Sequence, residues 1–147
     1  MGLFDNLFGG MGPNKELTKQ EAFAGILLSA IASDGHVSDE EAQGMWTILG
    51  RMKMFDNWAP DKFNHMMNRL LGILKREGHQ KLMSRSAEAL PEKLRPTAFC
   101  AACDLVLADG VVEDAEKEFL DELQGLLEIS GDQALSIVEV MILKNQG

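Results

Sequence analysis

The sequence contains one short acidic segment twice, and this duplication constrains the fold more than any other feature. Residues 32–42 have the sequence ASDGHVSDEEA, and residues 107–117 have the sequence LADGVVEDAEK. Each segment places a Glu seven positions after the Asp of an Asp-Gly pair, and the two aspartates lie 75 positions apart. Apolar positions after each segment keep the same register, with helical spacing. We therefore expect two copies of one structural unit.

Apolar residues recur with helical periodicity along the chain, between Gly, Pro and Asp residues that end helices. Strand signals are weak, because Tyr is absent, β-branched residues are sparse and no period-2 alternation is sustained. The periodicity predicts helices over residues 18–33, 38–53, 60–76, 79–89, 95–108, 113–128 and 131–144. The predicted fold class is all-α: a single-domain bundle of about seven helices, built from two repeated three-helix units.

Local signals explain several of these boundaries. The glycine of each Asp-Gly pair suits the left-handed conformation that follows many helix ends. Ser38 and Glu41 have the spacing of a capping box, in which each side chain bonds the backbone N–H of the other residue. Pro60 suits the first turn of a helix. In the second copy the cap position holds Glu113, a poor N-cap residue, so capping accounts less well for Glu116.

The chain divides into an arm and one domain. Residues 1–14 are predicted to be a flexible N-terminal arm, and residues 15–147 to form the helical domain. No apolar run approaches the roughly 18 residues that a membrane-spanning helix needs. The N-terminus also lacks the basic region and continuous apolar core of a signal peptide. These features predict a cytoplasmic protein without a transmembrane segment.

Charge is distributed unevenly. The net charge is −9, which disfavours nucleic-acid binding because that binding depends on Lys and Arg neutralising phosphates. Residues 51–100 hold 10 Lys and Arg against 5 Asp and Glu, a net of +5, so the remainder carries −14. Two interpretations follow: a solvated surface with a basic middle, or two acidic ends that fold together into a cation-attracting surface.

The acidic segments match only half of a calcium-binding EF-hand loop. Asp34 and Glu41 occupy loop positions 5 and 12, and Asp109 and Glu116 occupy the same positions in the second copy. The residues at loop positions 1 and 3 are apolar and cannot ligate: Ala30, Ala32, Leu105 and Leu107. Because calcium prefers 6–8 oxygen ligands, one copy alone is insufficient. Two adjacent copies would offer four carboxylates to one divalent cation, Ca²⁺, Mg²⁺, Mn²⁺ or Zn²⁺; otherwise both segments are ordinary helix–turn–helix corners.

The paired DGxVxxxE segments and the block LRPTAFCAACDLVLADGVVEDAEKEFL resemble the TerB family of tellurite-resistance proteins. The resemblance covers about residues 15–144. It implies an all-helical domain, a bacterial stress response to tellurite, and protein partners at the inner membrane. The family's suspected metal-coordinating acidic residues correspond here to Asp34, Glu41, Asp109 and Glu116. The same domain occurs in a membrane-anchored DnaJ-type co-chaperone.

No enzymatic motif accompanies these segments, and we expect a non-enzymatic protein. The sequence has no Gly-rich phosphate loop, nucleophile elbow or HExxH zinc-protease motif. Cys100 and Cys103 fall within an apolar helix and are predicted to be buried thiols. The expected function is a stress-response module that binds a divalent cation. The alternative is a co-chaperone-type interaction module that uses no metal.

Overall fold

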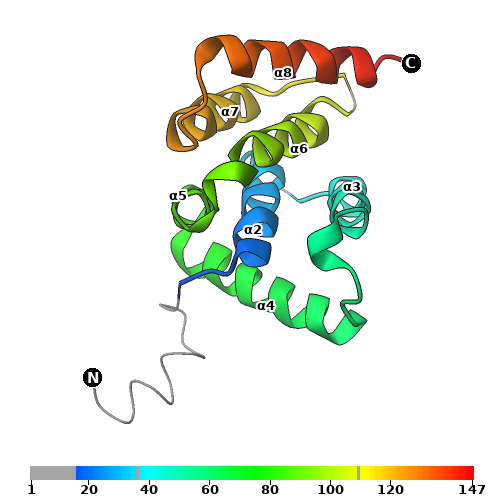
Figure 1. Cartoon of the computed structure of the whole chain (residues 1–147), viewed down its shortest axis with the longest axis vertical. Coiled ribbons are helices and arrows are strands. Elements are labelled where there is room, and N and C mark those ends of the chain that lie inside the picture. The colour runs from blue at the N-terminus through cyan, green and yellow to red at the C-terminus, as the bar shows by residue number, and fades with distance from the viewer. Residues whose placement is uncertain (1–15, 36, 109) are drawn as a thin grey trace.

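The computed structural model describes residues 16–35, 37–108 and 110–147, and these residues confirm the all-α prediction (Figure 1). They form seven α-helices and two short 3-10 helices, with no strand among them. The α-helices are α2 (Lys19–Ala32), α3 (Asp39–Gly50), α4 (Pro60–Glu77), α5 (His79–Ala89), α6 (Arg95–Leu107), α7 (Asp114–Leu126) and α8 (Gly131–Lys144). The 3-10 helices are η1 (Lys53–Phe55) and η2 (Glu92–Leu94). The predicted arm, residues 1–14, lies outside the described residues.

Helix α2 forms the centre of the bundle. Every residue from Ala22 to Ala32 is buried, so this helix has no solvent-exposed face over that length. A helix that is apolar on all sides is stable only when other elements surround it. Helices α3, α4, α5, α6 and α7 all pack against α2, with α4 at one end of the molecule and α8 at the other (Figure 1).

The predicted helix boundaries agree with the structure except around residue 50. The helix predicted over 38–53 ends at Gly50, and η1 follows it. Asn57 then adopts a φ of 66°, a left-handed conformation that Asn tolerates better than most residues, and α4 starts at Pro60 as expected. Gly35 has a φ of 83°, which confirms the predicted glycine-dependent turn after α2.

An aromatic cluster connects α3 to α4 through η1. Phe63 of α4 lies 5.4 Å from Trp46 of α3, 5.3 Å from Phe55 and 5.2 Å from Trp58, measured between ring centroids. Lys62 places its Nζ 4.3 Å from the centre of the Trp58 ring, a cation–π contact. Such aromatic pairs stabilise by about 0.5–1.5 kcal/mol each beyond their burial. The cluster therefore helps to fix the direction of α3.

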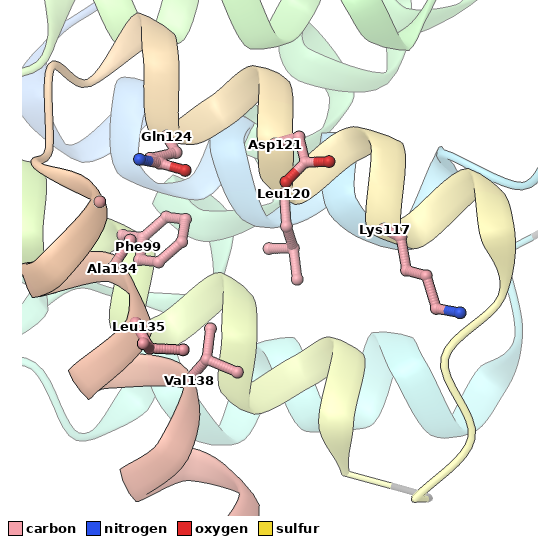
Figure 2. A pocket seen from close by; sticks show the side chains of 9 residues that line it. Phe99, Lys117, Leu120, Asp121, Gln124, Ala134, Leu135 and Val138 are labelled. Atoms are coloured by element: carbon pink, nitrogen blue, oxygen red, sulfur yellow. The ribbon is translucent and has the colours of Figure 1, made fainter.

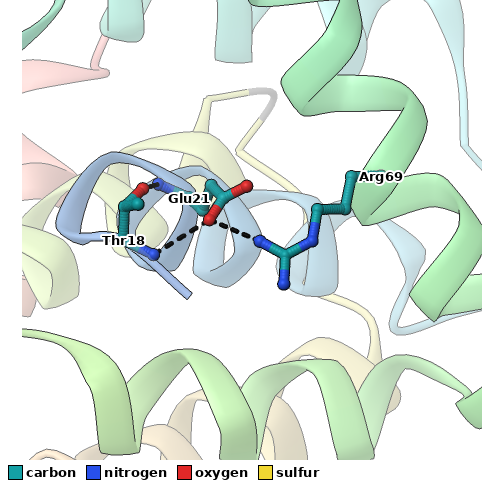
Figure 3. Close-up of polar contacts among 3 residues, drawn as sticks. All are labelled: Thr18, Glu21 and Arg69. Carbon is teal, nitrogen blue, oxygen red and sulfur yellow. Dashed lines mark hydrogen bonds and ion pairs between the residues drawn. The ribbon is translucent and has the colours of Figure 1, made fainter. Parts of the chain in front are cut away.

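An ion pair joins α4 to the start of α2 (Figure 3). The Arg69 guanidinium contacts Glu21 Oε1 at 2.5 Å, and both side chains are largely buried. The same oxygen accepts a hydrogen bond from the backbone N–H of Thr18 at 2.9 Å, while Thr18 Oγ1 accepts from the N–H of Glu21. Burial alone would raise the pKa of Glu21, but the hydrogen bonds and charge of Arg69 and the bonds to Thr18 lower it below its ordinary value.

Helices α2 and α5 approach each other closely at a glycine. A Cβ atom added to Gly25 would lie 2.2 Å from Ser86 Oγ, which is closer than real atoms come. The Ser86 hydroxyl is buried and has no hydrogen-bond partner among the described residues. Gly25 is therefore required because the two helices are so close. A left-handed backbone conformation is not the reason, since Gly25 lies within helix α2.

The contacts between the two halves are reciprocal. Helix α2 packs against α6, α3 packs against α6, and α7 packs against α2. A pseudo-twofold axis that exchanges α2 with α6 and α3 with α7 would produce these same contacts. Equivalence of the two three-helix units remains a prediction from the sequence.

Candidate functional site

The two acidic segments meet at one cavity between the start of α3, the end of α6 and the start of α7. The cavity has a volume of about 230 Å³. Its lining residues come from all three helices and from the residues that cap α3 and α6: Ser38, Glu40, Glu41, Gly44, Leu105, Val106, Ala108 and Glu116. Glu41 and Glu116, which lie 75 positions apart in the sequence, thus contribute to the same space. The two segments are thus adjacent here, which is the condition for a shared cation site.

Glu41 is held at the cavity by the capping box of α3. Its backbone N–H donates to Ser38 Oγ at 3.1 Å. Its Oε1 in turn accepts hydrogen bonds from the Ser38 backbone N–H at 3.4 Å and from the Ser38 hydroxyl at 2.9 Å. These bonds confirm the predicted capping box. They fix one oxygen of the carboxylate and hold the Glu41 side chain at the N-terminus of α3.

Glu116 is held in the same way at the start of α7, which corrects an expectation from the sequence. Its Oε1 accepts the backbone N–H of Glu113 at 2.9 Å, so Glu116 closes the N-terminal turn although Glu113 is a poor cap residue. The prediction underestimated capping here because the bond comes from the Glu113 backbone, which any residue supplies. Glu116 is also buried, with 8% of its surface exposed.

The two aspartates of the predicted set are placed differently. Asp34 is exposed in the turn after α2 and does not belong to the cavity lining. Asp109 lies outside the described residues. Within residues 16–35, 37–108 and 110–147, no group of three or more His, Cys, Asp or Glu side chains is arranged to hold a metal ion. The described part of the chain therefore supplies two of the four predicted ligands to one cavity.

Six of the eight lining residues were not predicted as site residues, and two of these, Glu40 and Gly44, affect the charge and shape of the cavity. Glu40 adds a third carboxylate to the cavity lining, from the first turn of α3. A Cβ atom on Gly44 would lie 3.1 Å from Leu105 Cδ2, so the absence of a side chain lets α3 approach α6. Helical spacing offered one signal, because Gly44 lies one turn after Glu40 and three residues after Glu41 and so shares their face of α3.

The cavity combines carboxylates with an apolar wall. Leu105 and Val106 of α6 form the apolar part of the lining, and the glutamates of α3 and α7 form its charged part. Charges interact more strongly where apolar side chains exclude water, since the effective dielectric constant is lower there. Neighbouring carboxylates in such a site repel one another and attract cations. The described lining residues include no His or Cys, and oxygen ligands of this kind suit Ca²⁺, Mg²⁺ or Mn²⁺ better than softer metals.

The two cysteines are not among the lining residues of this cavity and are poorly suited to thiolate chemistry. Cys103 is fully buried in α6, and Cys100 is half-buried. Burial, with smaller contributions from Cys100 and Asp104, raises the pKa of the Cys103 thiol to about 12. Burial also raises the pKa of Cys100. Both thiols are therefore protonated at neutral pH, as expected for structural cysteines.

Comparison with known proteins identifies the family. A family description, "Tellurite resistance protein TerB", matches residues 20–137, which is most of the chain. No curated protein and no solved structure matched the chain. Among the described helices, none is both long and apolar enough to cross a membrane. The matched region contains α3 to α7, nearly all of α2, half of α8 and both acidic segments, and the chain belongs to the TerB family of tellurite-resistance proteins.

Proposed function

We propose that this chain is a non-enzymatic module of tellurite resistance and stress response that binds a divalent cation between its two acidic corners. The observation that carries the proposal is the shared cavity, which Glu41 and Glu116 line from different helices. Asp34 and Asp109 are the proposed additional ligands, since they precede these glutamates by seven positions in each copy. The ion is one that accepts carboxylate oxygens: Ca²⁺, Mg²⁺ or Mn²⁺ before Zn²⁺.

Membership of the family supports the cellular part of this proposal. The family description names tellurite resistance, and we assign the chain to that response. We further propose that it acts in the bacterial cytoplasm and works with protein partners at the inner membrane. A cation would then link its stability or its partner affinity to metal concentration, because any ligand that binds only the folded state stabilises that state.

Calorimetric titration of the chelator-stripped chain tests the proposal. We expect one of Ca²⁺, Mg²⁺, Mn²⁺ or Zn²⁺ to bind with one ion per chain. Glu41→Gln and Glu116→Gln should each abolish binding, because glutamine can still accept the capping bond but carries no charge. Asp34→Asn and Asp109→Asn test the two proposed loop ligands.

Asp114→Asn is the matched control. It removes one negative charge from the first turn of α7, but its side chain is almost fully exposed and does not line the cavity. We expect this variant to bind the ion as the unmodified chain does. Affinity weaker than about 1 mM for all four ions would overturn the metal proposal, since that is the weak limit for calcium modules.

A second candidate is an interaction module in which the acidic corners dock a basic partner segment without metal. Val37 and Val111, beside these corners, are exposed by 42% and 60%, and apolar side chains beside charges are common in protein interfaces. This candidate predicts that a lysine-rich peptide binds the metal-free chain. Binding that Glu41→Gln or Glu116→Gln removes, together with no affinity for the four ions, would favour it over the metal site.

A further inference from the structure

A groove separate from the acidic cavity runs between α7 and α8 (Figure 2). Its volume is about 320 Å³. Phe99 of α6 lies deep between the two helices, Leu120 projects from α7, and Leu135 and Val138 project from α8 (Figure 2). Lys117, Asp121 and Gln124 complete the α7 side. The groove and the acidic cavity share no lining residue, so each can be tested alone.

Helix α8 carries more apolar side chains than the fold covers. Ala134 is its one buried residue. Four of its large apolar side chains are exposed by between 45% and 68%: Leu135, Val140, Ile142 and Leu143. Leu135 is the member of this set that lines the groove, and an exposed leucine beside buried Phe99 and half-buried Val138 marks an interaction surface.

Charge indicates what kind of segment fits this groove. Residues 114–144, which contain α7 and α8, hold 8 Asp and Glu against 2 Lys, a net of −6. Asp121 and Lys117 on the groove itself offset each other, so the local negative charge comes from Asp132 and Glu139, which are exposed on α8. An apolar groove between two helices of negative net charge complements an amphipathic helix whose apolar row is flanked by Lys or Arg.

Other occupants complement the groove less well. The N-terminal residues 1–15 of this chain contain a single basic residue, Lys15. A second copy that paired groove to groove would place two surfaces of the same negative sign against each other. Helix α4 is basic near its end, but its large apolar residues Met66, Leu70 and Ile73 are buried in the core. It therefore has no apolar row left to offer to another copy.

We propose that the groove between α7 and α8 docks a basic amphipathic helix of a partner protein. The partner's apolar side chains, spaced three and four residues apart, would contact Leu120, Leu135 and Val138 over Phe99. Its Lys or Arg side chains would lie near Asp121 and the exposed acids of α8. The surface lies outside the acidic cavity, and its use does not depend on metal binding.

The test uses the full chain and a fluorescently labelled, 18-residue helical peptide of Leu and Lys as the probe, followed by anisotropy. Leu135→Ser should weaken binding roughly 5- to 10-fold, as expected for an apolar contact at the centre of an interface. Asp121→Asn should weaken it less and reduce its salt dependence. Leu71→Ser is the matched control, since Leu71 is an exposed leucine of α4 and should leave the affinity unchanged within about twofold.

Each remaining outcome decides against the proposal. A scrambled peptide of the same composition that binds equally well would show nonspecific charge attraction. An equal loss in Leu71→Ser and Leu135→Ser would place the contact elsewhere. Sedimentation that shows a dimer which Leu135→Ser dissociates would identify a second copy as the occupant. A chain lacking residues 1–15 that binds the peptide at least tenfold more tightly would identify the N-terminal arm as the occupant.

Discussion

Helices α4 and α8 follow the two acidic corners at equivalent places in the sequence, but the fold uses them differently. Helix α4 buries Met66, Leu70 and Ile73 against α2 and α5, whereas α8 buries only Ala134 and packs against α6. In the alignment of the two halves, Ala134 corresponds to Phe63 of α4, so a small side chain stands where the first half has an aromatic ring. The comparison indicates that the first half completes the core and the second half keeps a binding surface.

The ion pair of the first half also lacks a counterpart in the second. Glu21 aligns with Pro96, and Arg69 aligns with Val140, which is 56% exposed. Helix α4 is thus tied to the start of the central helix, while α8 is joined to α6 by the more exposed contact of Lys144 with Asp104 at 3.1 Å. Exposed ion pairs add little stability. Three measurements of unfolding test this contrast and the helix contacts on which it depends.

Truncation of one leucine in α4 and one in α8 should give the largest difference in the free energy of unfolding. Leu70→Ala in α4 removes a fully buried side chain and should lower the free energy of unfolding by about 2–5 kcal/mol. Leu135→Ala in α8 removes a side chain that is 59% exposed and should change it by no more than about 0.5 kcal/mol. Urea unfolding followed by circular dichroism measures both. Similar losses in the two variants would refute the contrast.

Gly25→Ala should lower the free energy of unfolding by about 1–3 kcal/mol, because the new methyl group would overlap Ser86 in a packed core. Gly125→Ala in α7 is the matched control, since no atom lies within 4 Å of the added group, and helix propensity should raise stability by up to about 1 kcal/mol. Addition of Ser86→Ala to Gly25→Ala should recover part of the loss. If Gly25→Ala is stabilising, the two helices are not in close contact.

Glu21→Gln should lower the free energy of unfolding by about 1–2 kcal/mol at neutral pH, because Arg69 loses a charged hydrogen-bond partner. The folded-state pKa of Glu21 is lowered, so its contribution is present above the ordinary value of 4.5 and is lost as pH falls through the folded value. As pH falls from above 4.5 through the folded-state pKa of Glu21, the Glu21→Gln variant should therefore lose less stability than the unmodified chain.

Glu77→Gln is the control for this pH dependence. Its partner Arg85 lies 2.9 Å away, but the pair is more exposed than that of Glu21 with Arg69, and its loss should change stability by less than about 1 kcal/mol. Parallel pH profiles of Glu21→Gln and the unmodified chain would contradict the assigned role of Glu21. Thermal unfolding at a series of pH values gives all three profiles.

The fold was largely predictable from the sequence because its signals are local. Helical periodicity, the Ser38–Glu41 cap, Pro60 and the Asp-Gly turns each act within a few residues. The end of α3 was placed three residues late because apolar Met52 continues the helical pattern into η1. The residue at which a helix ends is harder to predict than the helix itself, because tertiary packing decides where the chain leaves the helix.

The candidate site was only partly predictable. The repeat indicated Glu41 and Glu116, but the presence of Glu40 at the cavity depends on how closely α3 approaches α6 at Gly44. The groove of α7 and α8 could not be predicted either. Periodicity shows which residues of α8 are apolar, but packing against α6 decides which of them remain uncovered.

The central claim is that the two acidic corners act on one ion, and paramagnetic broadening by Mn²⁺ in NMR spectra tests it most directly. Addition of Mn²⁺ should broaden the amide signals of residues 38–44 and of residues 105–116 together, with a single midpoint and one ion per chain. Glu41→Gln should prevent broadening at both corners. Broadening at one corner alone, or two separate midpoints, would contradict the claim.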